Sequence, residues 1–349
     1  MKRITLFLTV IALFIGSAVM INGCTKEGPQ GPAGTNGTNG VDGINGTDGT
    51  AACSACHNFG TTVKSAVTQW EASLHATGGH FDRNGTSCAP CHTHEGFRET
   101  FATAATATAA AIENATPPNC YTCHDVHKTY TAADWTIVGN DAHPLWINGV
   151  SINLASGNNC AHCHQARIPS PTVTVGGADV VITSDRWGPH YGGQSLILYG
   201  TGGFEIAGSM AYPAAGSYVH AKDAGCVKCH MAPAYGNKAG GHTTKMSYEY
   251  NGATVQHLAG CKECHSTITT FDHNSRQTEI TALKEELFNK LVEVGIGDPS
   301  HGRNKKGTFT ATVAGAYLNY ALVKYDASMG VHNYPYTYAL LKNSLESLQ

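Results

Sequence analysis

Charged side chains are scarce in this chain of 349 residues, at 13% of the total. The 22 lysines and arginines are outnumbered by 25 aspartates and glutamates, and they form no basic stripe along the sequence. A protein that binds nucleic acid gathers basic side chains on one face or in one segment. We therefore predict that nucleic acid is not a partner.

Cysteine, by contrast, is abundant, with thirteen residues. Twelve of them form six Cys-x-x-Cys pairs, and histidine follows every pair although only 19 of the 349 residues are histidine. The six motifs consist of Cys53, Cys56 and His57; Cys88, Cys91 and His92; Cys120, Cys123 and His124; Cys160, Cys163 and His164; Cys226, Cys229 and His230; and Cys261, Cys264 and His265.

Cys-x-x-Cys-His is the attachment motif of haem c. Its two thiols form thioethers on one porphyrin edge, and the histidine that follows is held under the iron as the proximal ligand. Zinc sites do not require a histidine after every pair, and redox dithiols do not occur six to a chain. The sequence therefore predicts six covalent haem c groups, held by the twelve cysteines and ligated by the six motif histidines.

The N-terminus has the pattern of a secretory signal peptide, with Lys2 and Arg3 before an apolar stretch at residues 4–20. Residues 21–24, I-N-G-C, resemble a bacterial lipobox, although asparagine is unusual at its place. The resemblance implies removal of residues 1–23 and acylation of Cys24. An uncleaved anchor and plain secretion are the alternatives, but an unpaired cysteine in an exported chain favours lipidation, which would tether the protein to a membrane.

Residues 28–50 carry glycine at every third position, a collagen-type period. Only two prolines, Pro29 and Pro32, lie in this stretch. We therefore expect residues 24–50 to be an acylated N-terminus followed by a soluble spacer, with a trimeric stalk, and hence a homotrimer, as the alternative. Thr25 stands where an aspartate would favour inner-membrane retention. An exported lipoprotein of the outer membrane, exposed at the cell surface, is the predicted location.

Residues 51–349 form the predicted haem domain. Its fold class is mostly α with extensive loops, organised around six covalent haems with a short helix at each motif. The stretch 171–183, P-T-V-T-V-G-G-A-D-V-V-I-T, predicts one small β-hairpin with a turn at Gly176 and Gly177.

The end of the chain predicts a C-terminal helical bundle that begins at about residue 278. One face of a helix over residues 278–294 collects the apolar side chains Ile280, Leu283, Leu287 and Leu291. Residues 311–325 and 336–348 are also predicted to be helical.

Each iron of a low-spin electron carrier needs a second axial ligand. Thirteen histidines remain after the six of the motifs, whereas the chain has six methionines, two of them, Met1 and Met20, in the signal peptide. Histidine on both faces of each iron is therefore the favoured ligation.

Several stretches resemble the multihaem c-type cytochromes of metal-respiring bacteria. One of them, at residues 330–341, is also similar to the C-terminal part of pentahaem nitrite reductases. The resemblance covers most of residues 53–349. The stretches are W-E-A-S-L-H-A (70–76), C-A-P-C-H-T-H-E-G-F (88–97), R-W-G-P-H-Y-G-G-Q (186–194), G-C-V-K-C-H-M (225–231), G-G-H-T-T-K-M (240–246) and G-V-H-N-Y-P-Y-T-Y-A-L-L (330–341).

The resemblance implies a set of distal iron ligands: His75, His190, His220, His242 and His332. His127, in C-H-D-V-H, completes the predicted six, with His94 and His143 in reserve. His162 lies inside a Cys-x-x-Cys pair, and we expect its ring to point outward.

One departure from the nitrite reductases bears on function. Those enzymes carry a lysine proximal ligand at the active-site haem, whereas all six motifs here end in histidine. The prediction is therefore a hexahaem electron carrier with no catalytic residue, which passes electrons to extracellular acceptors or to other redox proteins. The alternative is an oxidoreductase that reduces a small nitrogen or sulfur oxyanion at one open haem.

Overall fold

The computed structural model describes residues 57, 62–78, 80–103 and 105–349. These all belong to one compact unit, Thr50–Gln349. The predicted signal peptide, Cys24, the glycine-repeat spacer and the cysteines Cys53 and Cys56 lie outside the described residues. None of the helices in the described part combines the length and apolar character needed to cross a bilayer.

The described chain is mostly helical with long loops and small sheets, as the fold class predicted. The α-helices are α3 (Thr62–Glu71), α4 (Leu74–Thr77), α5 (Ala89–His92), α6 (His94–Thr100), α7 (Cys120–Cys123), α8 (Asn158–Ala161), α9 (Gln194–Tyr199), α10 (Gly225–His230), α11 (Ala259–Lys262), α12 (Arg276–Glu293), α13 (Ala311–Asp326) and α14 (Tyr334–Ser347). Shorter helical turns are η1 (Ala132–Trp135), η2 (Ala155–Gly157), η3 (His220–Ala224), η4 (Gly241–Thr243) and η5 (His273–Ser275).

The strands pair only two at a time within the described residues. They are β1 (His143–Pro144) with β2 (Ser151–Ile152), β3 (Val180–Ile182) with β8 (Gly307–Phe309), β4 (Ser247–Tyr250) with β5 (Ala253–Gln256), and β6 (Gly297–Asp298) with β7 (Arg303–Asn304), all antiparallel.

The hairpin predicted over residues 171–183 is wrong. A turn does form there, since the Gly177 amide donates to the Thr174 carbonyl at 3.0 Å, but β3 pairs with β8 instead of folding back on residues 172–174. An isolated two-stranded hairpin is marginal in water. Pairing with β8 lets β3 bury Val180 and Ile182 in the main apolar core, which a local hairpin would leave exposed.

A hairpin that the sequence analysis does not predict lies at β4 and β5. Asn251 and Gly252 connect the strands with φ angles of +50° and +77°. Two successive positive φ values are what a type I′ turn requires, and Asn-Gly between strand-forming residues is its usual signature.

Short helices lie at the five described motifs, as expected: α5, α7, α8, α10 and α11. One helical turn brings residues three apart onto the same face, so both cysteines of a motif can face one edge of a porphyrin. The turn at α7 is held by a capping box, in which Asn119 and Thr122 exchange side-chain and backbone hydrogen bonds.

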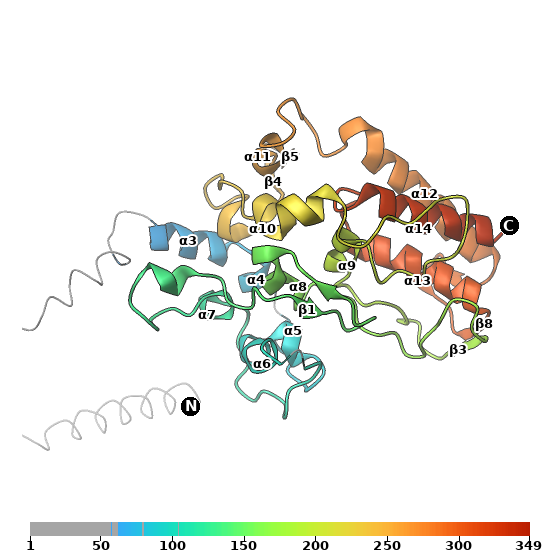
Figure 1. Ribbon diagram of the computed structural model, residues 1–349, viewed down its shortest axis with the longest axis horizontal. Helices are drawn as coiled ribbons and strands as arrows, with labels where there is room; N and C mark the ends of the chain where they lie inside the picture. Colours follow the sequence, from blue (N-terminus) through green and yellow to red (C-terminus); the bar gives the residue numbers. More distant parts are fainter. Residues whose placement is uncertain (1–56, 58–61, 79, 104) are drawn as a thin grey trace, which may run out of the picture. The chain divides into compact units, whose positions relative to one another are not determined.

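The predicted C-terminal bundle is confirmed. Helices α12, α13 and α14 pack on one another (Figure 1). Ile280, Leu287 and Leu291 of the predicted face are fully buried. The connected apolar core contains buried side chains from Leu145 to Leu348, including large tyrosines of α13 and α14. The bundle is thus a core of ordinary side chains without a Cys-x-x-Cys-His motif.

Candidate functional site

The five described motifs are neighbours in space. Gly260 of α11 packs so closely on α10 that an added Cβ would lie 2.5 Å from the carbonyl oxygen of Lys228. The other contacts join Cys91 Sγ to the His162 carbonyl (3.9 Å), Cys163 Sγ to the Pro90 carbonyl (3.6 Å), Cys123 Sγ to Asn159 Oδ1 (3.4 Å) and Cys226 Sγ to the Gly157 carbonyl (3.9 Å). The motifs therefore form one connected network, in which the motif at α8 contacts those at α5, α7 and α10 and α10 contacts α11. All ten of their cysteines are free of disulfides.

Every motif histidine faces a second histidine ring. The distances between ring centroids are 5.9 Å for His57 and His127, 6.2 Å for His164 and His75, 6.3 Å for His92 and His190, 6.3 Å for His124 and His242, 6.2 Å for His265 and His220, and 6.3 Å for His230 and His332. The second members are the six histidines nominated as distal ligands, and they come from segments far from their partners in sequence.

This spacing fits a shared metal ion. Two imidazole nitrogens, each about 2.0 Å from one metal, place the ring centroids about 6.3 Å apart. Rings stacked face to face lie closer, as His143 and His162 do at 3.7 Å. Aromatic rings in edge-on contact reach similar distances, as Phe101 and His162 do at 6.2 Å, but each of the six pairs joins a motif histidine to a second histidine, and the gap between the two rings is wide enough for one metal ion. The residues present therefore fit haem.

The packing of the N-terminal half also fits a large apolar cofactor. Between residues 62 and 144, the buried apolar side chains of the described chain are only Ala89, Pro90 and Phe97. A segment of this length needs more buried apolar surface than that to fold stably. Covalently held porphyrins would supply it.

Two of the second histidines sit in strained backbone. His127 and His190 have φ angles of +63° and +64°, in the left-handed region that residues other than glycine rarely occupy. Such a conformation costs about 1–3 kcal/mol and persists where the surrounding structure imposes it, often at ligand-binding positions.

Burial lowers the pKa of most of these rings, which favours the neutral imidazole that a metal requires. The pKa of His75 falls to about 4, first because protein surrounds the ring and then because His164 lies nearby. Solvent still reaches the side chains of His75 and His164, as expected for two rings on either side of an open gap. Burial is also the largest cause of the lowered pKa of five other rings, those of His92, His190, His220, His230 and His242.

His332 is different, because its pKa is raised. Burial lowers it, but the carboxylate of Asp326, whose Oδ1 lies 2.5 Å from Nδ1 of His332, raises it more.

The sequence did not single out two further histidines at these sites. His80 lies 6.2 Å from His92, as close as His190 does, and His273 lies 5.1 Å from His265. Nothing in the sequence distinguished them from the rest of the thirteen histidines that are not the proximal histidines of the motifs. Only one of the two rings could share an iron with His92, so His80 and His190 would compete for one position.

The reserves His94 and His143 do not face a motif histidine across such a gap. His143 is buried with both ring nitrogens unpartnered and stacks on His162. The outward position expected for His162 is wrong, since its ring is half-buried and also packs edge-on against Phe97 and Phe101.

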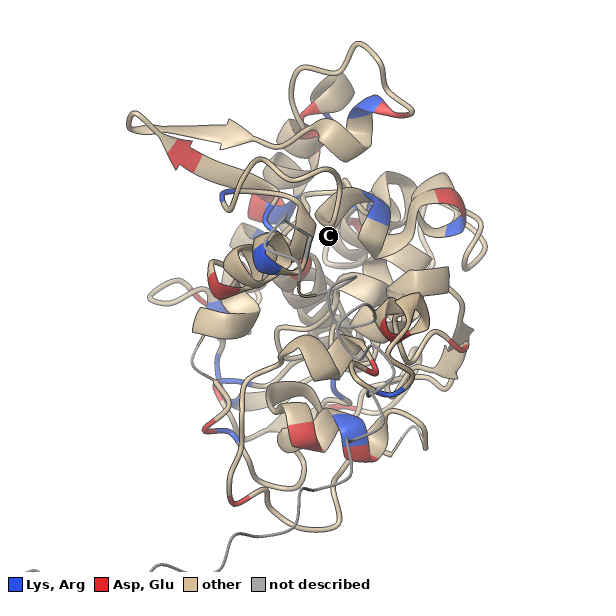
Figure 2. Cartoon of the chain, turned by 90° about the vertical axis from the view of Figure 1, so that its left-hand side faces the viewer, with Lys and Arg blue, Asp and Glu red and all other residues tan. Residues whose placement is uncertain are grey.

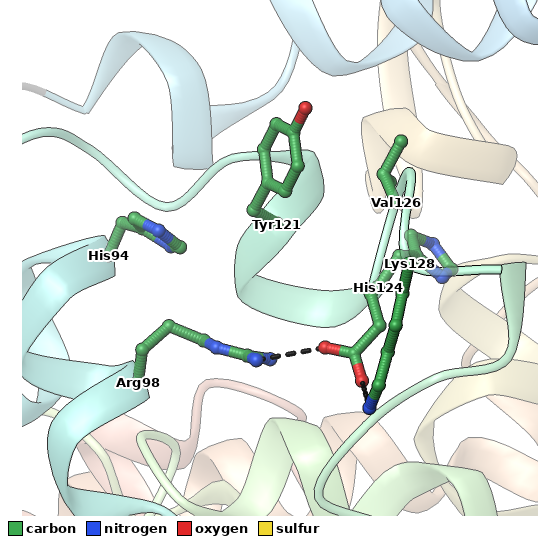
Figure 3. Close-up of a pocket in the computed structure, with 7 residues that line it drawn as sticks. His94, Arg98, Tyr121, His124, Val126 and Lys128 are labelled. Atoms are coloured by element: carbon green, nitrogen blue, oxygen red, sulfur yellow. Dashed lines mark hydrogen bonds and ion pairs between the residues drawn. The ribbon is translucent and has the colours of Figure 1, made fainter. Parts of the chain in front are cut away.

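His94 lies in a pocket of about 280 Å³ beside His124 (Figure 3). Its Nδ1 is 3.0 Å from the Thr122 hydroxyl. Arg98 and Lys128 line the pocket, and both pair with Asp125, at 2.8 and 2.9 Å. This carboxylate offsets part of the two positive charges of the pocket. On the face shown in Figure 2, residues of both signs are interspersed.

Comparison with known proteins adds a likeness in fold. No family model and no curated protein matches the chain. Among solved structures, the crystal structure of the outer cell wall cytochrome OcwA matches 80% of the chain with 20% identity and a TM-score of 0.49. The chain spans 50% of the length of that cytochrome. A match this weak supports no conclusion about activity.

Proposed function

We propose that this chain is a hexahaem c-type cytochrome that transfers electrons. The observation that carries the proposal is the set of six ring pairs, each with one motif histidine and one further histidine at the spacing of a shared metal. In such a site the cysteines hold haem c by thioethers, and the two histidines ligate its iron. The haem, when bound, supplies one-electron chemistry.

The arrangement favours a carrier over an enzyme. A histidine on each side of every iron leaves no position where a substrate oxygen or nitrogen can bind. The connected network of motifs favours electron hopping between neighbouring haems. The chain's own part in this function is to set each potential through ligands, burial and hydrogen bonds.

Electron paramagnetic resonance of the oxidised holoprotein tests this function. Spins are counted against haem content measured as the pyridine haemochrome. We expect six haems, all low-spin. A high-spin centre whose spectrum changes with nitrite or hydroxylamine would instead identify an open iron and support the oxidoreductase.

We further propose that Cys24 carries the lipid that holds the protein at the outer membrane, with residues 28–50 as the spacer that lifts the haem domain toward the cell surface. The lipobox-like I-N-G-C and the unpaired Cys24 support this. Extracellular electron acceptors and other redox proteins are the proposed partners.

Labelling of growing cells with a tagged fatty acid tests the anchor. We expect the wild-type protein to incorporate the label and Cys24→Ala to incorporate none, because the thiol is the acylation site. Thr25→Ala is the matched control and should keep the label. Label retained on Cys24→Ala would remove the lipoprotein from the proposal.

A further inference from the structure

The loop between α13 and α14 holds one of the ligand histidines by a buried carboxylate. Asp326 ends α13, and its side chain is fully shielded from solvent. Its Oδ1 lies 2.5 Å from Nδ1 of His332. A buried carboxylate lowers the stability of the fold unless it is paired and hydrogen-bonded. The contact with His332 provides this pairing for Asp326.

The same loop is closed tightly around the carboxylate. Ser328 donates to Oδ2 of Asp326 from its hydroxyl, and its amide donates at 3.3 Å. The amide of His332 donates in turn to the Ser328 hydroxyl at 3.2 Å. Ala327 and Met329 adopt φ angles of +60° and +49°. Two strained residues in so short a loop indicate that packing imposes this geometry.

For three of the other ligand rings, the structure places a neutral hydrogen-bond partner at Nδ1. Within the described residues, His332 is the one ring of the six pairs that contacts a carboxylate. The neutral acceptors are the Thr244 carbonyl for His230 (3.0 Å), the Val331 carbonyl for His220 (2.6 Å) and Gln194 Oε1 for His164 (3.3 Å), while Nδ1 of His124 is buried without a partner.

We infer that Asp326 gives the centre ligated by His230 and His332 the lowest reduction potential of the six. This inference rests on the proposed function. A carboxylate that accepts the outer N–H of a ligating histidine makes the ring a stronger donor. A stronger donor and a buried negative charge both favour Fe(III), the more positive state, over Fe(II). Asp326 is thus a positioning residue that acts through His332.

Asp326→Asn removes the charge and keeps the shape. The amide oxygen can still accept from His332, so all six haems stay attached and low-spin. We expect the lowest of the six potentials to rise by about 59 mV, a tenfold change in a one-electron equilibrium, while the other five stay in place. The measurement is a spectropotentiometric titration of the full holoprotein, with low-spin signals followed by electron paramagnetic resonance.

Ser328→Ala provides a test of opposite sign, and it also serves if Asp326→Asn fails to fold. Without the Ser328 hydroxyl donor, the carboxylate oxygens share their charge with one hydrogen bond fewer and accept more strongly from His332, so the lowest potential should fall. A purely structural role would not produce opposite shifts from the two variants. Asp298→Asn is the matched control, because Asp298 contacts His301 at 3.3 Å outside the six pairs; it should move no potential.

The outcomes separate the inference from the function on which it rests. Unchanged potentials in Asp326→Asn, in a protein with six low-spin haems, would overturn the inference alone. The same holds if Ser328→Ala raises the lowest potential. A high-spin centre in the unaltered protein would count against the electron carrier, whereas the potential shift in Asp326→Asn would still be measurable at the centre of His332.

Discussion

We expect replacement of His75 with alanine to convert one low-spin haem to high-spin and to leave all six haems of the proposed cytochrome attached. The His75 ring is 6.2 Å from that of His164, and the described residues place no other histidine ring against His164. If the proposed ligation holds, loss of His75 would therefore leave the iron bound by His164 without its second ligand. The thioethers to Cys160 and Cys163 do not depend on the distal ring.

The measurement is a spin count by electron paramagnetic resonance, set against haem content. Alanine favours the helical conformation of α4, so the substitution should not disturb the local fold. His301→Ala is the matched control, since His301 belongs to none of the six pairs, and it should keep six low-spin centres. If His75→Ala also stays fully low-spin, His75 is not a ligand.

Replacing His190 with alanine has a different expected result, because His80 is a second candidate at the same distance from His92. His80 is exposed and begins a turn in which the Arg83 amide donates to its carbonyl. The His80 imidazole could then take the place of His190 opposite His92. We expect His190→Ala to retain six low-spin haems with an altered spectrum at one of them.

The double variant completes the test. His80→Ala with His190→Ala should give six haems and one high-spin centre, whereas His80→Ala alone should change nothing if His190 is the resident ligand. A high-spin centre already present in His190→Ala would show that His80 does not reach the iron. A high-spin centre in His80→Ala alone would reverse the two assignments.

These two predictions differ only because of long-range packing. From the sequence, His75 and His190 were equivalent nominations drawn from a family resemblance. The fold brings His80 beside His92 and, among the described residues, gives His164 no such second histidine neighbour. The same packing stacks His143 on His162, although the sequence suggested an outward ring for His162.

The sequence by itself determined the features that depend on neighbouring residues. Cys-x-x-Cys-His places two thiols and an imidazole by covalent spacing alone, so the six attachment motifs could be predicted without a fold. The helices after residue 278 were predictable because a 3.6-residue apolar period reports a buried face directly. The Asn-Gly turn at residues 251–252 was equally local, and its signal was available in the sequence.

The tertiary structure alone decided which distant residues meet. Pairing of β3 with β8 depends on where the C-terminal bundle offers an apolar surface, and no local pattern around residue 180 carries that information. The same is true of the contact between His332 and Asp326, in which a strained loop selects one carboxylate from the chain's 25 acidic residues. Such packing also decides which two histidine rings pair, because the histidine residue type alone specifies no partner.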